Sequence, residues 1–203
     1  MIKILLKIKL FIVILTIGSV LKADPYSLAN ISQYLTNLKF LKADFLQTNA
    51  DGTASSGAIL IKRPGRMRFE YYKPDKTLVL ISSGALAIFD PKGDEEPITY
   101  PIKNNPISLV LTGEVDLLNS GIVENYEKSI EEAVLTVRDP KRPERGSVEL
   151  VFTGAKPELK QFSIKNENGS STSILLNDIE YPKKINETLF SISLEINKRK
   201  NKD

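Results

Sequence analysis

The chain has 203 residues, with 28 lysines and arginines against 25 aspartates and glutamates, and it contains no cysteine and no histidine. The two missing residue types exclude disulfide bonds, thiol nucleophiles, Ser-His-Asp triads and zinc sites built on cysteine or histidine, and they exclude acylation of the chain itself at an N-terminal cysteine. The remaining candidates for catalysis, adjacent acids such as Asp94–Glu96 and Glu131–Glu132, lie beside turn residues where carboxylates are usually solvated, so we expect no catalytic residue, metal or cofactor.

Residues 1–23 have the layout of a secretory signal peptide. Three lysines precede an apolar core at residues 10–21, and a cut after Ala23 would leave the polar sequence DPYS at the new N-terminus. The apolar run is too short for a membrane-spanning helix. We therefore expect a cleaved signal peptide, with an uncleaved amphipathic anchor as the alternative.

Cleavage changes the charge balance. Residues 1–23 contain four lysines and no acid, so the remainder has 24 basic and 25 acidic residues and a net charge of −1. Because binding to phosphates needs a basic surface, nucleic acid is not an expected partner. Residues 24–203 contain no linker and no internal repeat, which predicts a single domain.

The first element of the mature chain is expected to be an amphipathic helix. Asp24 looks like its N-cap, and Pro25 takes the first helical position. Apolar residues then recur at spacings of three and four: Leu28, Ile31, Leu35 and Leu38. This stripe should lie on an apolar surface.

From Phe40 onwards, short runs with β-strand character alternate with turn residues. Six runs lie at 41–48, 56–63, 66–72, 77–82, 85–90 and 96–102, and six more at 122–128, 133–139, 147–154, 159–166, 171–181 and 188–196. The fold class this predicts is α+β, with a long antiparallel sheet that must curl or close to hide one face. Residues 197–203 are expected to be a disordered tail, with attraction to an anionic membrane as the weaker interpretation.

A different segment separates the two groups of strands. Asn105 is a candidate N-cap, Pro106 fits the first helical position, and Gly113 is a candidate stop for a short helix that is apolar nearly all round. It could be a buried crossover helix or a lid over the concave face of the sheet. The pattern favours neither.

Arg63 is unusual because it stands in line with large apolar residues. In a hairpin with a two-residue Pro64-Gly65 loop, charged and apolar side chains would share one face. A three-residue loop that includes Arg66 pairs Arg63 with Met67. In this register Lys62, Arg68 and Glu70 point outwards. The opposite face then carries Ile59, Ile61, Arg63, Met67, Phe69 and Tyr71. Arg63 is then either a latch at the end of an apolar row or a rim arginine whose charge reaches water.

At these residues the sequence resembles the LolA family, the periplasmic carriers of outer-membrane lipoproteins. The resemblance runs in order through "FLQT", "SGAILIKRPGRMRFEY", "PDKTLVLISSGALAIFDP", "NNPISLVLTG" and "LNDIEYPKKINETLFSISL". It implies an unclosed β-barrel with a helical lid, which holds the acyl chains of a triacylated lipoprotein in an apolar cavity. It also implies that Arg63 bonds to carbonyls of the lid and keeps the empty carrier closed.

The resemblance extends to partners and to binding residues. It implies an ATP-driven releasing complex in the inner membrane, an acceptor at the outer membrane, and a monomeric carrier. The candidate acyl-binding residues are Phe45, Ile59, Ile61, Arg63, Met67, Phe69, Tyr71, Leu80, Ile88, Leu109 and Leu111. The chain departs from the family pattern where Phe69 and Ile88 replace larger aromatic residues and where a glutamine after Asp90-Pro91 is missing.

Two other classes of function remain open at this stage. A periplasmic sensor of lipids or lipoproteins could share the fold, but it would ordinarily carry a second domain after the lipid-binding one. An enzyme that uses carboxylates would need two acids facing each other across a cleft. Paired acids inside the cavity would favour the enzyme.

Overall fold

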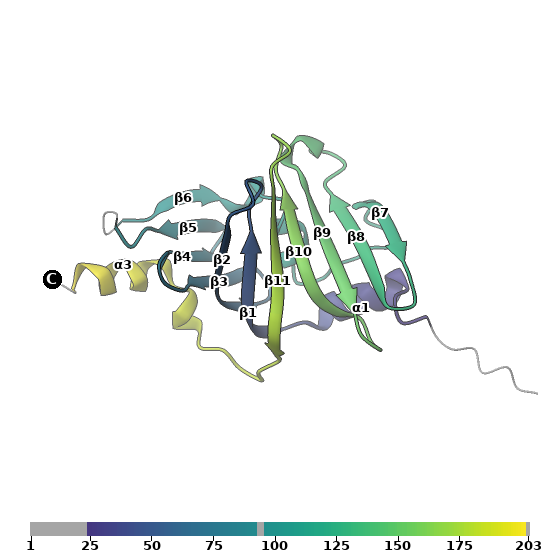
Figure 1. Cartoon of the computed structure of the whole chain (residues 1–203), viewed down its shortest axis with the longest axis horizontal. Helices are drawn as coiled ribbons and strands as arrows, with labels where there is room; N and C mark the ends of the chain where they lie inside the picture. The colour runs from purple at the N-terminus through teal and green to yellow at the C-terminus, as the bar shows by residue number, and fades with distance from the viewer. Residues whose placement is uncertain (1–23, 93–95, 202–203) are drawn as a thin grey trace, which may run out of the picture.

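The computed structural model describes residues 24–92 and 96–201, which form one antiparallel 11-stranded sheet in the order β6-β5-β4-β3-β2-β1-β11-β10-β9-β8-β7 (Figure 1). The strands are β1 Phe40–Thr48, β2 Ala54–Lys62, β3 Arg66–Tyr71, β4 Leu78–Ser82, β5 Ala85–Phe89, β6 Ile98–Pro101, β7 Val123–Lys128, β8 Glu132–Arg138, β9 Ser147–Thr153, β10 Glu158–Lys165 and β11 Ser171–Glu180. The helices are α1 Leu28–Asn37, η1 Ile102–Asn104, α2 Ser108–Leu111, η2 Pro143–Arg145, η3 Glu187–Phe190 and α3 Ile192–Lys200. The predicted α+β class and the unclosed, curved sheet are confirmed. The expected signal peptide lies outside the described residues.

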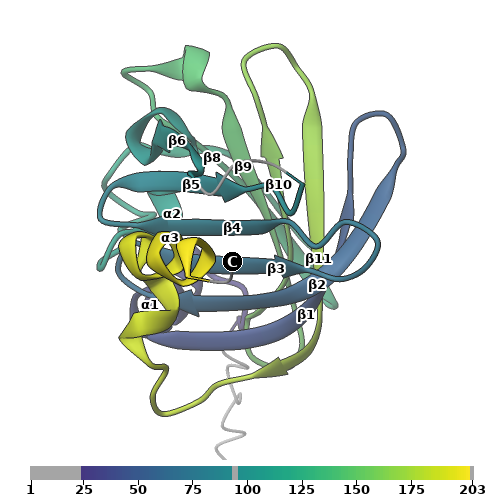
Figure 2. The same cartoon turned by 90° about the vertical axis from the view of Figure 1, so that its left-hand side faces the viewer.

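The sheet curves because β-bulges bend several of its strands. The register shifts between Lys42 and Asp44 where β1 meets β11, and again between Leu159 and Gln161 where β10 meets β9. As a result, β2–β6 turn across the direction of β8–β11, and the sheet folds around its inner face (Figure 2). The main apolar core lies on that inner face, where side chains of the strands meet those of α1 and α2.

Helix α1 begins later than predicted. Ser27, not Asp24, is its N-cap, and the Ser27 hydroxyl accepts a hydrogen bond from the backbone N–H of Asn30 at 3.3 Å. The reason is Tyr26, which is 1% exposed and whose hydroxyl lies 2.7 Å from the carbonyls of Glu131 and Gly154. This anchorage to the β7–β8 and β9–β10 turns holds the chain in a turn before the helix. The predicted stripe is otherwise correct, because Ile31, Leu35 and Leu38 are buried in the main core.

The last predicted strand, 188–196, is wrong. These residues form η3 and α3, with Ser191 as the N-cap of α3. The sequence SISLEI alternates every second residue, but Ile192 and Ile196 are also four apart, and in the helix both pack on the outer face of the sheet. The tail prediction is wrong as well for residues 197–200, which form the last turn of α3; there Arg199 lies 4.8 Å above the ring of Phe89.

Arg68 was expected to point outwards into solvent, but it is buried beneath this C-terminal segment. Its guanidinium donates to the carbonyl of Leu189 at 3.1 Å and to the carboxylate of Glu70 at 3.1 Å. Strand β3 is therefore covered on both faces, with the main apolar core on one side and η3–α3 on the other (Figure 2). The prediction that Arg68 lies on the outer face is correct, but the sequence did not indicate that the C-terminal segment covers this face.

The register of the β2–β3 hairpin differs from the predicted one by two residues. Lys62 pairs with Arg66 and Ile61 with Met67, so the loop consists of Arg63, Pro64 and Gly65. Gly65 adopts φ 71°, a conformation that favours glycine, which fixes the loop one residue earlier than expected. Because the shift is even, each side chain keeps its predicted face.

Gly57 allows the aromatic side chain of Phe45 to lie across β2. A Cβ at this position would lie 2.3 Å from the carbonyl oxygen of Glu70 and 2.7 Å from the ring of Phe45. We expect Gly57→Ala to destabilise the protein by about 1–3 kcal/mol through overpacking, measured by urea unfolding. Ser56→Ala, on the neighbouring exposed position, should change stability by less than about 0.5 kcal/mol. Equal stabilities of the two variants would contradict this account of Gly57.

Candidate functional site

Two rows of apolar side chains cross the inner face of strands β2–β6. One row pairs Ile59, Phe69, Val79, Ile88 and Ile98, and the other pairs Ile61, Met67, Ile81, Leu86 and Tyr100. Both rows are buried at β2 and β3 and become exposed at the sheet edge, where Ile98 is 60% and Tyr100 53% accessible. The inner face is therefore a continuous apolar surface that leads from the core to open solvent.

An aromatic cluster borders this surface. The ring of Phe45 meets Phe69 and Tyr71 edge-on, at centroid distances of 5.5 Å and 5.1 Å. The Tyr71 hydroxyl donates to the side-chain carbonyl of Gln47 at 2.6 Å, and burial raises the pKa of Tyr71 to about 12. These rings fix one side of the apolar surface, because each packs against two neighbours or holds a polar anchor.

Residues 105–117, which we call the lid, cover the inner face. The Asn105 side chain accepts from the N–H of Ile107 at 3.0 Å in the turn before α2. The predicted N-cap is nevertheless wrong, because α2 begins at Ser108 and its N-cap is Ile107. The apolar lid residues Ile107, Val110 and Leu111 are buried in the main core. This burial over the concave face fits both interpretations left open by the sequence, the crossover helix and the lid.

The lid is tied to helix α1 by hydrogen bonds at its C-terminal part. The N–H of Val115 donates to the Thr36 hydroxyl at 3.2 Å, and the N–H of Leu117 donates to the Ser32 hydroxyl at 3.0 Å. These bonds use hydroxyl groups on one side of α1 as acceptors for backbone groups that would otherwise lack a partner. The lid and α1 are thus linked through polar contacts as well as through the apolar core.

Arg63 joins the β2–β3 hairpin to the lid. Its side chain is buried, at 6% exposure, and Nη2 donates to the carbonyl of Thr112 at the C-terminal end of α2. Next to it, the N–H of Gly65 donates to the carbonyl of Leu111 at 2.8 Å. The interpretation of Arg63 as an exposed rim arginine is therefore wrong. Carbonyls at a helix end lack intrahelical partners, and the hairpin supplies two donors for them.

The guanidinium is not fully satisfied. Nε and Nη1 of Arg63 are buried without a hydrogen-bond partner among the described residues, so the side chain bonds one lid carbonyl and not several. Burial lowers the pKa of Arg63 to about 10, which still leaves it charged at neutral pH. A buried donor without a partner costs about 1–3 kcal/mol. Arg63 consequently stabilises the closed arrangement less than a guanidinium with all its donors paired would do.

Two small cavities remain between the lid and the sheet. One of about 30 Å³ lies beside Arg63, Leu38 and Met67, and one of about 190 Å³ lies between Phe69, Ile107 and strands β10–β11. Sites for drug-sized ligands usually measure about 300–1,000 Å³. The space beneath the lid is thus mostly filled by side chains, so the apolar cavity expected from the sequence is not open in this structure. An acyl chain could enter only if the lid moved.

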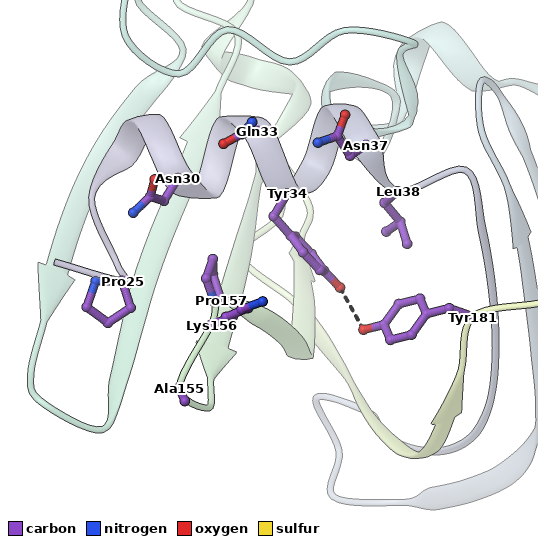
Figure 3. Close-up of a pocket in the computed structure, with 10 residues that line it drawn as sticks. All are labelled: Pro25, Asn30, Gln33, Tyr34, Asn37, Leu38, Ala155, Lys156, Pro157 and Tyr181. Carbon is purple, nitrogen blue, oxygen red and sulfur yellow. Dashed lines mark hydrogen bonds between the residues drawn. The ribbon is translucent and has the colours of Figure 1, made fainter. Parts of the chain in front are cut away.

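A larger hollow of about 790 Å³ lies on the solvent side of helix α1, and we call it the α1 groove (Figure 3). Helix α1 forms one wall, and the β9–β10 turn and the chain after β11 form the other. The hydroxyls of Tyr34 and Tyr181 lie 3.2 Å apart across it, and Tyr34 also accepts from the N–H of Leu159 at 3.1 Å. Leu38 lines both this groove and the cavity beside Arg63.

Residues 36–193 match the family described as outer membrane lipoprotein carrier protein LolA. The chain belongs to the LolA family. This confirms the resemblance found in the sequence. Within residues 24–92 and 96–201, no helix is long and apolar enough to cross a membrane.

Relatives in the LolA family are distant but collinear with this chain. An outer-membrane lipoprotein carrier protein from Coxiella burnetii is 26% identical over 189 residues, which cover 88% of each chain. One from Methylococcus capsulatus is 24% identical over 187 residues, covering 87% of this chain and 88% of the relative. Among solved structures, a LolA superfamily protein from Nitrosomonas europaea covers 81% of this chain and 97% of its own, with a TM-score of 0.44 and 10% identity.

The candidate acyl-binding residues divide into three groups. Phe45, Ile59, Ile61, Met67, Phe69 and Leu111 lie in the main core with Arg63 beside them, and Tyr71 and Leu109 pack partly buried against it. Ile88 lies in the inner row but nearer the exposed edge. Leu80 was assigned to the wrong face: it pairs with Arg68 and packs beneath α3 with Leu78, Ala87 and Phe89. Because β4 is apolar on both faces, its sequence carries no alternation to indicate which residues point inwards.

Sequence reasoning missed the part of the inner surface that comes from the second half of the chain. Leu150, Leu159 and Phe162 line the cavity beside Arg63, together with Ile107 and Val110 of the lid. The signal was present, because Leu150 and Phe152 alternate with polar or half-buried residues in β9. What the sequence could not show is that the curvature of the sheet brings β9 and β10 opposite the β2–β3 hairpin.

Proposed function

We propose that this protein is a periplasmic, non-enzymatic carrier that binds the acyl chains of lipoproteins between its curved sheet and its lid, and moves them from the inner to the outer membrane. Membership of the LolA family supports a lipoprotein carrier. The observation that carries the mechanism is the buried contact between Arg63 and the Thr112 carbonyl, which closes the lid over an apolar surface.

The size of the hydrophobic term explains why such a carrier must bind weakly. Three acyl chains contain roughly 40 methylenes, and at about 0.8 kcal/mol each their exposure to water costs on the order of 30 kcal/mol. Non-covalent affinities level off near about 20 kcal/mol, and a carrier close to that limit would not release its cargo. Loading therefore requires an energised partner, which we take to be an ATP-driven complex of the inner membrane, and unloading requires an acceptor at the outer membrane.

The lid supplies a means of weakening the complex. Acyl chains have to displace Ile107, Val110 and Leu111 from the inner face, because the cavities beneath the closed lid are small. Displacement breaks the bond between Arg63 and Thr112, and closure restores it after the cargo leaves. The free energy of closing the empty carrier thus opposes binding and favours release.

Removal of the Arg63 guanidinium tests this mechanism. The latch hypothesis requires that the charge-assisted bond lost in Arg63→Leu, worth about 1.5–3 kcal/mol, outweighs the relief of the two unpaired donors that the substitution also removes. The variant should therefore load readily and release slowly, with the rate of transfer to acceptor membranes lowered by about tenfold. The measurement is a handover assay with purified, preloaded carrier.

Arg66→Leu is the matched control for this assay. It removes a guanidinium from the same hairpin, but the Arg66 side chain lies beside Ser82 and Glu187, away from the lid. Its transfer rate should equal that of the wild type. If Arg63→Leu also transfers cargo at the wild-type rate, Arg63 does not act as a latch.

The periplasmic location depends on removal of residues 1–23. The remaining chain should begin at Asp24, whose carboxylate forms an ion pair with Lys128. Mass spectrometry of the protein from the native periplasm should give the mass of residues 24–203. A mass that includes residues 1–23 would contradict cleavage and favour a membrane anchor.

A further inference from the structure

A carrier that buries the acyl chains of a lipoprotein must still let the polypeptide out. Peptide N–H and C=O groups cannot be left unpaired in an apolar cavity, because each costs about 1–3 kcal/mol there. The exit therefore needs hydrogen-bonding groups and must adjoin the acyl-binding space. We propose that the α1 groove is this exit, and that it binds the first residues after the acylated cysteine as an extended, uncharged peptide; the inference rests on the proposed function.

The α1 groove adjoins the space beneath the lid. Leu38 separates it from the cavity beside Arg63, so displacement of this one side chain would connect the two spaces. Leu159 makes a second connection, since its side chain lines the inner cavity while its N–H donates to the Tyr34 hydroxyl in the groove. Arg63 lies at the junction, with Nε and Nη1 buried and unpaired among the described residues.

The chemistry of the groove matches a peptide backbone. Asn30, Gln33 and Asn37 form a row of amides along α1, and Figure 3 shows Tyr34 and Tyr181 meeting beneath this helix. Amides donate and accept hydrogen bonds, as peptide groups do. No hydrogen bond joins the Gln33 or Asn37 side chain to another described residue, so both are available. Tyrosine and asparagine are also enriched in the binding loops of antibodies, where they supply contact area and adaptable hydrogen bonds.

The length of the α1 groove and the charges around it indicate which peptides would fit. From Asn30 to Asn37 helix α1 rises by about 10 Å, and an extended chain covers this distance in about three residues. Lys156 is the charged residue that lines the groove, and Glu158 lies close enough to Tyr181 to help raise the pKa of its hydroxyl. One cation and one anion leave the site nearly neutral. It therefore suits small uncharged residues and offers no cluster of cations for a phosphate.

The test uses two synthetic probes. One is triacylated cysteine amide, and the other is the same group followed by the neutral linker Ser-Gly-Asn-Ser. The wild type should bind the probe with the linker about tenfold more tightly, the effect of two ordinary hydrogen bonds. Gln33→Ala/Asn37→Ala should bind both probes with the affinity that the wild type has for the shorter one. Gln161→Ala, which removes an amide from β10 outside the groove, should retain the wild-type ratio.

A photoreactive group on the third linker residue gives an independent readout. Cross-links should form with α1 or with residues 155–157. Cross-links at Ile98 or Tyr100 would place the exit at the open edge of the sheet and overturn the proposal, as would equal affinities of the wild type for both probes. If the wild type retains neither probe, the proposed function itself fails, and this inference fails with it.

Discussion

The closed structure depends on a charged group in an apolar place. Arg63 is buried at the end of the β2–β3 hairpin and uses one of its donors to hold the Thr112 carbonyl at the end of α2. A guanidinium leaves water at a high free-energy cost, and here two of its donors gain no partner among the described residues in return. The contact is therefore specific in direction but limited in strength. These are the properties that a lid needs if it is to close over an empty surface and yield to a large apolar ligand.

The packing of the sheet holds the hairpin that carries Arg63 in place. Strands β3–β5 are packed on both faces, because Arg68 and the apolar residues beneath α3 hold the C-terminal segment against the outer side. The hairpin that presents Arg63 is thus fixed from behind. The lid is held less extensively, by its apolar contacts, by two hydrogen bonds to α1 and by the two bonds from the hairpin. Movement is expected on the lid side of the interface.

The sequence predicted much of this arrangement where polar and apolar residues alternate. Four apolar residues lie on the predicted face, because Lys62, Arg68 and Glu70 mark the opposite face of the same strands: Ile59, Ile61, Met67 and Phe69. It failed where both faces are apolar, as at Leu80, and where one pattern fits two periods, as between Ile192 and Ile196. The two-residue register error left the faces unchanged because side chains in a strand alternate with a period of two.

Other features depend on contacts between distant segments. Neither the single bond made by Arg63 nor its two unpaired donors could be predicted, because they depend on the exact position of Thr112 relative to the hairpin. The α1 groove was likewise not predicted, since its walls come from α1, the β9–β10 turn and the chain after β11. Sequence patterns specify the direction of side chains along one element, but they do not specify which elements the curvature of the sheet brings together.

The central claim is that cargo and lid closure exclude each other. Because the chain lacks cysteine, spin labels can be attached to cysteines introduced at Glu114 in the lid and at Lys73 in the β3–β4 loop, both of which are exposed. Pulsed electron paramagnetic resonance should give one narrow distance distribution for the empty protein and one at longer distance when triacylated lipopeptide is bound. The empty Arg63→Leu variant should already populate the longer distance. An unchanged distance distribution at saturating lipopeptide would contradict the account.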